Sequence, residues 1–376
     1  MNKSPNQSAG PAEKSPAASA AGRAAASTAG GTAQGPVLSV EDLRTEIHTE
    51  RGTLRAVDGV SFTVGRGEMF GIVGESGSGK SVLGRTVMGL YSNGPSMTVT
   101  GKAVLDGTDV HALSDTERRK LWGTRVGMIF QDPTTALNPV KRVGRHLTES
   151  LRRHGGLSRA AARTRAEELL ALVGIPEPRR RLDQYPHELS GGMRQRVVIA
   201  MALAGEPSLL IADEPTTALD VTVQKQILDL LARLQSELGT AIILISHNLA
   251  VVAGRADRVA VMYAGRMAET APAAALFENP RHPYTEALLA SVPQLGDPPH
   301  TTLQAIEGTP PNIAALPDGC RFAPRCRHAQ LDCQDELPVL VPVSGDDHGH
   351  AFACFHPVGS PPSDSTARDS ENAGGA

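Results

Sequence analysis

The sequence predicts a mixed α/β protein, and three segments carry that prediction. The apolar run MFGIV (69–73) leads through a glycine-rich turn into a helical pattern, and the run LLIA (209–212) ends at two carboxylates. Short apolar runs bounded by turn residues are typical of strands buried on both faces of a parallel sheet. The segment RAAARTRAEELLALVG (159–174) is an amphipathic helix pattern that stops at a glycine. Strands alternating with helices therefore define the expected fold class.

Charge and composition exclude several classes of function. The 376-residue chain carries 37 basic and 40 acidic residues, for a formal net charge of -3, and only 3% of it is aromatic. A basic field and stacking aromatics mark nucleic-acid-binding surfaces, so we expect no nucleic acid partner. The longest strongly apolar runs, VVIAMALA (197–204) and AIILI (241–245), are far shorter than the roughly 20 residues that span a bilayer. Membrane association should therefore be peripheral, through a partner.

The two ends of the chain differ in composition from the rest. Residues 1–36 are rich in Ala, Ser, Gly and Pro, and charged residues interrupt any apolar stretch, so they do not resemble a secretory signal. Residues 358–376 have the same character. Segments of this kind bury too little apolar surface to fold, and both are predicted to be disordered tails.

The turn after the first apolar run has the pattern G-x-x-x-x-G-K-S. Glycines let backbone N–H groups wrap around phosphates, and the following helix N-terminus favours anions. The lysine would neutralise the β- and γ-phosphates, and the serine hydroxyl would bind Mg²⁺. A chance glycine-rich turn is the alternative, which the strand–loop–helix context disfavours. The predicted nucleotide-binding residues of this loop are Gly74, Glu75, Ser76, Gly77, Ser78, Gly79, Lys80 and Ser81.

Two carboxylates follow the second apolar run. Ligands of parallel sheets bind beyond the carboxyl ends of the strands. Asp213 is therefore predicted to join the Mg²⁺ shell, and Glu214 to act on the water that attacks the γ-phosphate, as general base or water-positioner. An acidic loop after a core strand would be the simpler reading only if the phosphate loop were absent.

A third motif, LSGGM (189–193), opens a strongly helical run. Ser190 is a favourable N-cap, and the exposed N–H groups at this helix start, including those of Gly191 and Gly192, make an anion site. Because the first loop already supplies one phosphate site, a second one makes sense if it reaches a nucleotide on another subunit. An ordinary turn and cap is the alternative.

These motifs, in this order, resemble those of ABC-type ATPases. The first loop is similar to their Walker A motif, 211–214 to Walker B and 189–193 to the signature motif. Gln131 resembles the Q-loop glutamine, and Asp220 ends a TALD stretch similar to the D-loop. The resemblance covers about residues 37–270. It implies a RecA-like P-loop NTPase core with an antiparallel β subdomain and an ABC helical subdomain at about 132–205.

The resemblance also implies how ATP is shared and cleaved. Two nucleotide-binding domains would form a head-to-tail dimer, with each ATP between one chain's Walker A motif and the signature residues Ser190, Gly191 and Gly192 of the other. His247 in ISHN is similar to the switch histidine, which would contact the γ-phosphate and orient the attacking water. Gln131 would touch Mg²⁺ or water and link the core to the helical subdomain. A strand-end histidine with a local partner is the alternative for His247.

One departure from the family pattern concerns adenine. The family has an aromatic residue near the start of the domain that stacks on the base, whereas the matching position here is Ile47. Stacking contributes roughly 1–3 kcal/mol in other systems. Ile47 and Val57 are predicted to sandwich the base by apolar contact instead.

The four cysteines of the chain all lie near its C-terminal end. Cys320, Cys326, Cys333 and Cys354 are spaced C-x5-C-x6-C-x20-C. Four thiolates can hold one [4Fe–4S] cluster or a zinc ion. The spacing contains no C-x2–4-C pair of the kind that zinc sites use, and stable disulfides are rare in the cytosol. A cluster is favoured, and zinc or free thiols remain alternatives.

The cysteine region supports a closer resemblance. FENPRHPYTEALLASVP (277–293) and the cysteine segment are similar to the C-terminal extension of oligopeptide and dipeptide importer ATPases, nickel importers included. YPHELSGGMRQR (185–196) and QDPTTALNPV (131–140) are closer to their cysteine-bearing D-type subunit, some members of which bind a [4Fe–4S] cluster. The extension is expected at 271–357, after a nucleotide-binding domain at 37–270.

This resemblance implies an import motor at the cytoplasmic face of the membrane. Its partners would be two transmembrane permease subunits and a second ABC ATPase subunit, an F-type sibling rather than a second copy. An extracytoplasmic substrate-binding protein would act indirectly. The expected cofactors are ATP, Mg²⁺ and a [4Fe–4S] cluster. The alternative is a soluble ABC ATPase with a redox-regulatory role outside transport.

Overall fold

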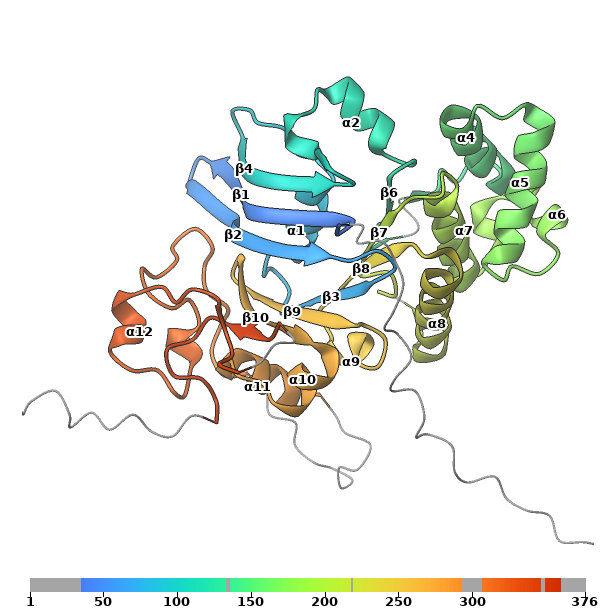
Figure 1. Ribbon diagram of the computed structural model, residues 1–376. Helices are drawn as coiled ribbons and strands as arrows, with labels where there is room; N and C mark the ends of the chain where they lie inside the picture. Colours follow the sequence, from blue (N-terminus) through green and yellow to red (C-terminus); the bar gives the residue numbers. More distant parts are fainter. Residues whose placement is uncertain (1–34, 133–135, 218, 293–305, 346–348, 360–376) are drawn as a thin grey trace, which may run out of the picture. The chain divides into compact units, whose positions relative to one another are not determined.

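An eight-stranded sheet of order β11-β12-β10-β9-β3-β8-β7-β6 organises the fold (Figure 1). The computed structural model describes residues 35–132, 136–217, 219–292, 306–345 and 349–359, so the predicted tails lie almost entirely outside the described residues. The five parallel strands of this eight-stranded sheet are β6 (Val126–Ile129), β7 (Leu209–Asp213), β8 (Ala241–Ser246), β3 (Met69–Val73) and β9 (Arg258–Tyr263). All residues of β3, β7 and β8 are buried, as the apolar runs predicted.

A second, antiparallel sheet packs against the first. Its order is β2-β1-β4-β5, from β1 (Leu38–Thr49), β2 (Gly52–Val64), β4 (Met97–Leu105) and β5 (Thr108–Asp109). Helix α1 (Lys80–Val87) shares the apolar core of the two sheets, in which the rings of Phe62 and Phe70 stack with centroids 5.1 Å apart. The expected antiparallel β subdomain is confirmed. Helix α2 (Asp115–Leu121) follows, and Ser114 and Glu117 close a capping box at its start.

A group of helices follows β6 in the chain. It consists of α4 (Val143–Gly155), α5 (Arg159–Leu172), the short α6 (Pro178–Arg181) and α7 (Gly191–Leu203). The predicted amphipathic helix is α5, which ends before Gly174 (φ 73°). Helix α7 contacts both α5 and β6, which attaches the group to the sheet. Helix α8 (Val221–Leu238), capped by Asp220 and Gly239, joins β7 to β8.

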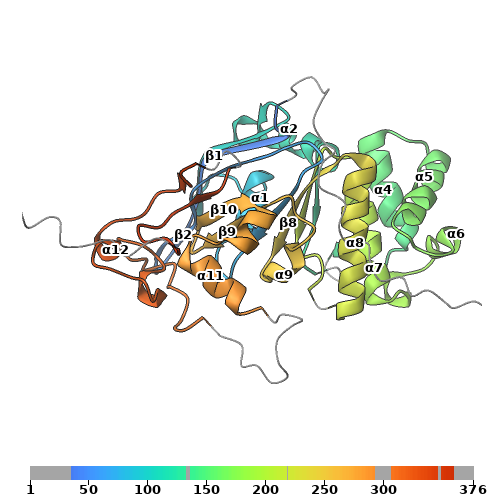
Figure 2. The ribbon, with the colours of Figure 1, turned by 60° about the horizontal axis from the view of Figure 1, so that its bottom comes forward.

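The C-terminal extension continues the central sheet. Strand β10 (Arg266–Pro272) pairs with β9, and the short β12 (Ala351–Phe352) pairs with both β10 and β11 (Val341–Pro342). The predicted boundary at residue 270 therefore falls inside β10. Figure 2 shows the extension at the opposite end of this sheet from α4–α6. The helices of the extension are α10 (Ala273–Glu278), α11 (Pro283–Ala290), the 3₁₀ turn η3 (Ala323–Arg325) and α12 (Asp332–Asp335), whereas the short α9 (Leu249–Val252) lies between β8 and β9.

Within the described parts of the chain, no helix has both the length and the apolar character required to cross a membrane.

Candidate functional site

The glycine-rich loop joins β3 to α1 in the geometry that phosphate binding requires. Gly74 (φ 153°), Gly77 (φ 82°) and Gly79 (φ 100°) have positive φ angles, which other residues rarely adopt. A Cβ atom on Gly74 would also collide with the carbonyl oxygen of Met262, and one on Gly79 with that of Ala56. The loop therefore lies tightly between β2 and β9, and its N–H groups precede a helix start that favours anions.

Lys80 is buried at the base of this loop. Its Nζ donates hydrogen bonds to the carbonyl oxygens of Gly74 and Glu75, both at 2.8 Å, and to Ser78 Oγ at 3.2 Å. Burial lowers the pKa of Lys80, and the carboxylates of Glu214, Asp213 and Glu75 oppose that shift. The ammonium group thus lies at the loop, with three carboxylates close enough to favour its charged form.

Ser81 and Asp213 are brought together from different elements. Ser81 Oγ donates a hydrogen bond of 2.7 Å to Asp213 Oδ1. Asp213 is fully buried, burial raises its pKa, and its Oδ2 has no hydrogen-bond partner although Arg85 lies 3.8 Å away. A buried carboxylate oxygen with free acceptor capacity beside a serine hydroxyl is the donor set that Mg²⁺ prefers. These residues fit the ion that the loop motif implies.

Three side chains converge on the carboxylate of Glu214. Oε2 accepts hydrogen bonds from Gln131 Nε2 at 3.0 Å and Thr217 Oγ1 at 2.9 Å, and His247 Nδ1 lies 3.1 Å from it. The backbone of Glu214 has a positive φ of 47°, and its N–H donates to the Ile245 carbonyl. Strained backbone of this kind is typical of functional positions. The three predicted catalytic residues, Glu214, His247 and Gln131, therefore form one cluster.

The signature residues lie elsewhere in the chain's fold. Ser190 is the N-cap of α7 and accepts a 3.3 Å hydrogen bond from the Met193 N–H. Gly191 and Gly192 approach the start of α8, where a Cβ on Gly192 would meet Val223. Asp220 caps α8 in the same way, by accepting from the Val223 N–H. Among the described residues, no hydrogen bond joins these caps to the glycine-rich loop.

The predicted pair of adenine-contacting residues is not brought together. Across the β1–β2 ladder, Ile47 lies opposite Leu54, whereas Val57 lies opposite Thr45. Val57 is fully buried in the core of the two sheets, while Ile47 is partly exposed. A base contact by Ile47 stays a prediction, and the structure offers no exposed Val57 side chain to complete a sandwich.

The four cysteines are drawn together by the extension. All four are free thiols that line one pocket, with Cys333 buried and the others partly exposed. Burial raises the pKa of each thiol, that of Cys354 to about 12. Hydrogen bonds from the backbone oppose this rise in pKa at three of the thiols. Each of Cys320, Cys326 and Cys354 accepts from the N–H of the residue two positions later in the chain.

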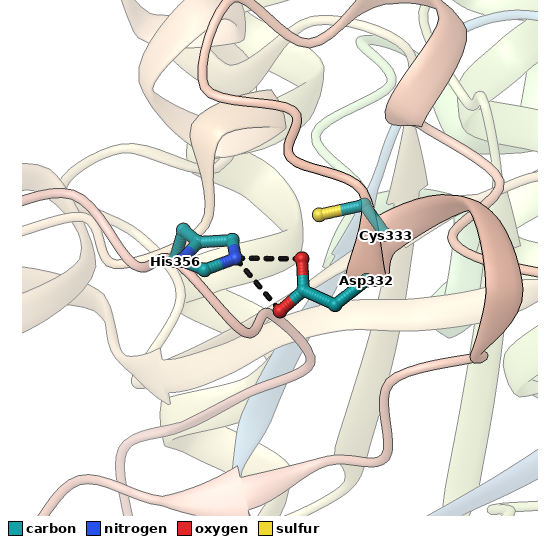
Figure 3. A group of neighbouring side chains, drawn as sticks. All are labelled: Asp332, Cys333 and His356. Carbon is teal, nitrogen blue, oxygen red and sulfur yellow. Dashed lines mark hydrogen bonds and ion pairs between the residues drawn. The ribbon is translucent and has the colours of Figure 1, made fainter. Parts of the chain in front are cut away.

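A histidine and an aspartate accompany one of these thiols (Figure 3). His356 Nε2 lies 2.8 and 2.9 Å from the two carboxylate oxygens of Asp332, and Cys333 Sγ lies near both side chains. Within the described part of the chain, no other group of three histidine, cysteine or carboxylate atoms lies within 4.8 Å of one another. No three of the four sulfurs therefore lie within 4.8 Å of one another.

Sequence reasoning missed three side chains of the site. Thr217 donates to Glu214, and Tyr284 Oη accepts a 2.8 Å hydrogen bond from the Glu75 N–H. Arg325, between two of the cysteines, forms two ion-pair contacts with the Glu75 carboxylate. Tyr284 and Arg325 lie more than 200 residues from Glu75 in the sequence, and no local motif predicts either contact. Thr217 follows Glu214 closely and could have been considered.

Comparison with known proteins agrees with this geometry. The family model described as ABC transporter matches residues 57–217, and the one described as oligopeptide/dipeptide transporter, C-terminal region, matches 268–333. The oligopeptide transport ATP-binding protein OppD of Bacillus subtilis is 51% identical over 321 residues, which are 85% of this chain and 89% of OppD. The dipeptide transport ATP-binding protein DppD of the same organism is 52% identical over 312 residues, which are 83% of this chain and 92% of DppD.

Solved structures show the same ATPase fold. The ATP-binding cassette MJ0796, in a dimeric post-hydrolysis state with ADP and phosphate, is 28% identical, with a TM-score of 0.56, and covers 63% of this chain and 98% of its own. CbiO1 of Clostridium perfringens, part of the complex cbiONQ, is 29% identical with a TM-score of 0.55, and covers 65% of this chain and 92% of its own. With its P-loop, its clustered carboxylates and its cysteine-bearing extension, this chain belongs to the ABC transporter ATPases, in the oligopeptide and dipeptide branch, and hydrolyses ATP.

Proposed function

We propose that this chain is the motor subunit of a peptide importer. The observation that carries the proposal is the presence, in one chain, of a full set of ATP-site residues and of a region that matches the oligopeptide/dipeptide transporter model. Two relatives at about half identity are named for oligopeptide and dipeptide transport. ATP binding and hydrolysis would be coupled to passage of a peptide through partner permease subunits.

The residues around Glu214 define the hydrolytic half of the site. Residues 74–81 cradle the phosphates, and Lys80 neutralises the β- and γ-phosphates once it exchanges the loop carbonyls for phosphate oxygens. Ser81, Asp213 and Gln131 would hold Mg²⁺, which would supply charge neutralisation when bound. Glu214 accepts a proton from the attacking water, or positions that water. His247, which contacts the same carboxylate, helps to orient the water.

The other half of the site comes from a second subunit. Ser190 is exposed at the start of α7, and Gly192 lies against Val223 of α8, while no hydrogen bond among the described residues joins this cap to the chain's own phosphate loop. Ser190, Gly191 and Gly192 therefore present an anion-binding helix start to the γ-phosphate of a partner, and Asp220 lies beside that contact. A dimeric arrangement is named for the similar cassette MJ0796. The partner is an F-type sibling rather than a second copy, because this chain is of the D-type.

The importer needs two transmembrane permease subunits, which hold this chain at the cytoplasmic face of the membrane. An external substrate-binding protein delivers the peptide to the permeases and does not touch this chain. The link to the permeases is the helical group α4–α7, which Gln131 joins to the Glu214 carboxylate.

The four cysteines of the pocket would together hold a [4Fe–4S] cluster. Tetrahedral zinc at 2.3 Å from four sulfurs would bring all of those sulfurs to about 3.8 Å of one another, whereas no three of the described thiols lie within 4.8 Å of one another. Backbone N–H groups that point at three of the sulfurs would stabilise thiolates, as they do in iron–sulfur sites. When bound, the cluster supplies four metal–thiolate bonds that stabilise a loop-rich segment.

Peptide uptake by cells that lack this chain tests the proposal. Loss of uptake of a labelled tripeptide, restored by the wild-type chain and not by Glu214→Gln, is the expected result, while uptake of a free amino acid stays unchanged. The chain should co-purify with integral membrane proteins. Recovery with ribosomes or with no membrane protein, together with unchanged peptide uptake, would instead favour the soluble regulatory ATPase.

A further inference from the structure

The cysteine segment reaches the phosphate loop through an arginine. Arg325 closes η3, directly before Cys326, and its side chain is only 4% exposed. Its two terminal nitrogens contact the two carboxylate oxygens of Glu75 at 2.7 and 3.0 Å. The remaining donors bond to the carbonyls of Ile306 and Glu307 and to Tyr263 Oη. A buried, bidentate and fully bonded guanidinium holds its partner in one orientation.

Glu75 is the second residue of the phosphate loop, so this contact acts at the nucleotide site. Its N–H is held by Tyr284 Oη at 2.8 Å, and its carbonyl accepts from Lys80. Its carboxylate is also close enough to influence the Lys80 ammonium. Without Arg325, that carboxylate would present an uncompensated negative charge beside the position of the triphosphate.

A second arginine of the cysteine segment is linked to the phosphate loop through intermediate residues. Arg321, directly after Cys320, donates to the buried carboxylate of Asp58 and to the Ala264 carbonyl. The next residue, Gly265, donates its N–H to the Ser78 carbonyl and accepts from the Asp58 N–H. The turn that supports Ser78 is therefore tied to the same short cysteine segment.

We infer that Arg325, assisted by Arg321, is a positioning residue of the ATP site, and that it couples the order of the segment between Cys320 and Cys326 to nucleotide affinity. The inference rests on the ATP site of the proposed function. By reciprocity, whatever orders this segment tightens nucleotide binding, and nucleotide binding orders the segment. The extension thus acts on the motor in the same chain.

Nucleotide affinity of the full-length chain tests the contact. For a fluorescent ATP analogue, Arg325→Ala should raise the Kd by about 5- to 150-fold, the usual range of such coupling. Arg327→Ala is the matched control: Arg327 lies in the same segment but is 64% exposed and pairs with Glu286. Its Kd should stay within about twofold of wild type. Arg325→Lys, which keeps the charge and loses the bidentate contact, should give an intermediate Kd.

The charge of Glu75 gives a sharper test. In a Glu75→Gln background, Arg325→Ala should no longer change the Kd, because no carboxylate is left to compensate. Equal loss in both backgrounds, or a Kd for Arg325→Ala equal to that of Arg327→Ala, overturns the inference. Melting temperatures show whether each variant is folded. If Arg325→Ala does not fold, the Kd of Arg325→Lys in the two backgrounds is compared instead.

Hydrogen–deuterium exchange provides a readout apart from affinity. The ATP analogue should slow amide exchange across 320–326 in wild type and in Arg327→Ala, and to a smaller degree in Arg325→Lys. Unchanged exchange across 320–326 in wild type overturns the coupling. A chain that binds ATP but does not support peptide uptake would refute the proposed function alone, because the affinity comparisons would still hold.

Discussion

Gln131 Nε2 donates a hydrogen bond of 3.0 Å to Glu214 Oε2, although 83 residues separate the two along the chain. Gln131 follows β6 and leads into the helical group, whereas Glu214 follows the neighbouring strand β7. The bond therefore joins the residue that follows β6 to the carboxylate that is predicted to act on the attacking water.

The first prediction concerns Glu214. Glu214→Gln removes the negative charge and leaves the phosphate loop and Lys80 intact. We expect ATP affinity to be retained and turnover to fall by at least about 10²-fold, the size of a general-base effect. Phosphate release at saturating ATP measures the turnover, and the nucleotide Kd measures the affinity. Glu237→Gln, an exposed change on α8, is the control. Unchanged turnover in Glu214→Gln would remove this residue from catalysis.

The second prediction concerns Lys80. Its ammonium makes three hydrogen bonds inside the loop and would make charge-assisted ones with phosphate. Lys80→Ala should therefore weaken ATP binding by roughly 10- to 100-fold, since hydrogen bonds to charged groups contribute about 1.5–3 kcal/mol. Titration with a fluorescent nucleotide measures the effect, and Lys225→Ala, on the exposed face of α8, should bind normally. Wild-type affinity in Lys80→Ala would contradict the assignment.

The sequence could predict the phosphate loop, Asp213, Glu214 and the cap of α7 because their geometry is local. The glycine spacing predicts the conformation of the loop. A carboxylate that directly follows a buried strand must lie at the carboxyl end of that strand, where ligands of parallel sheets bind. The burial of Val57 could not be predicted in this way, because β1 contains register shifts near Leu43 and Thr45, which break the simple alternation of faces. The contacts of Arg325 and Tyr284 with Glu75 depend on how the extension folds back onto the core, and no pattern of neighbouring residues encodes that path.

The third prediction concerns the shared site. Ser190→Ala should reduce ATP-driven dimerisation and hydrolysis while leaving ATP binding by the lone chain within about twofold, because this chain's own phosphate loop is untouched. Ser158→Ala is a matched control: Ser158 also caps a helix, α5, through a 3.3 Å hydrogen bond, so both changes lose a cap worth about 1 kcal/mol. Crosslinking and ATPase assays with the sibling subunit compare the two. Equal loss of binding and hydrolysis in Ser190→Ala would refute the shared site.

The fourth prediction concerns the metal content of the cysteine pocket. Protein purified without oxygen should be brown and contain about four irons per chain, as a [4Fe–4S] cluster requires. Cys333→Ser removes one of the four thiols that line the pocket and should lower the iron content, whereas His328→Asn, beside the pocket, should not. Elemental analysis for both iron and zinc decides. A colourless protein with one zinc per chain, or with neither metal, would exclude the cluster.

The fifth prediction concerns acid stability. His282 is buried at the start of α11, where its Nδ1 accepts from the Tyr284 N–H, and burial lowers its pKa to about 4. As the pH falls below 6.5 the unfolded chain binds this proton first, so the free energy of unfolding decreases between pH 6.5 and 4, by about 2 kcal/mol at pH 5. His282→Asn keeps an acceptor at the cap and removes the titrating group. Urea unfolding at pH 7 and pH 5 should show a smaller difference for this variant than for wild type, while the exposed change His187→Asn leaves the difference unaltered. An equal difference in His282→Asn and wild type would show that other groups, and not His282, set the acid limit.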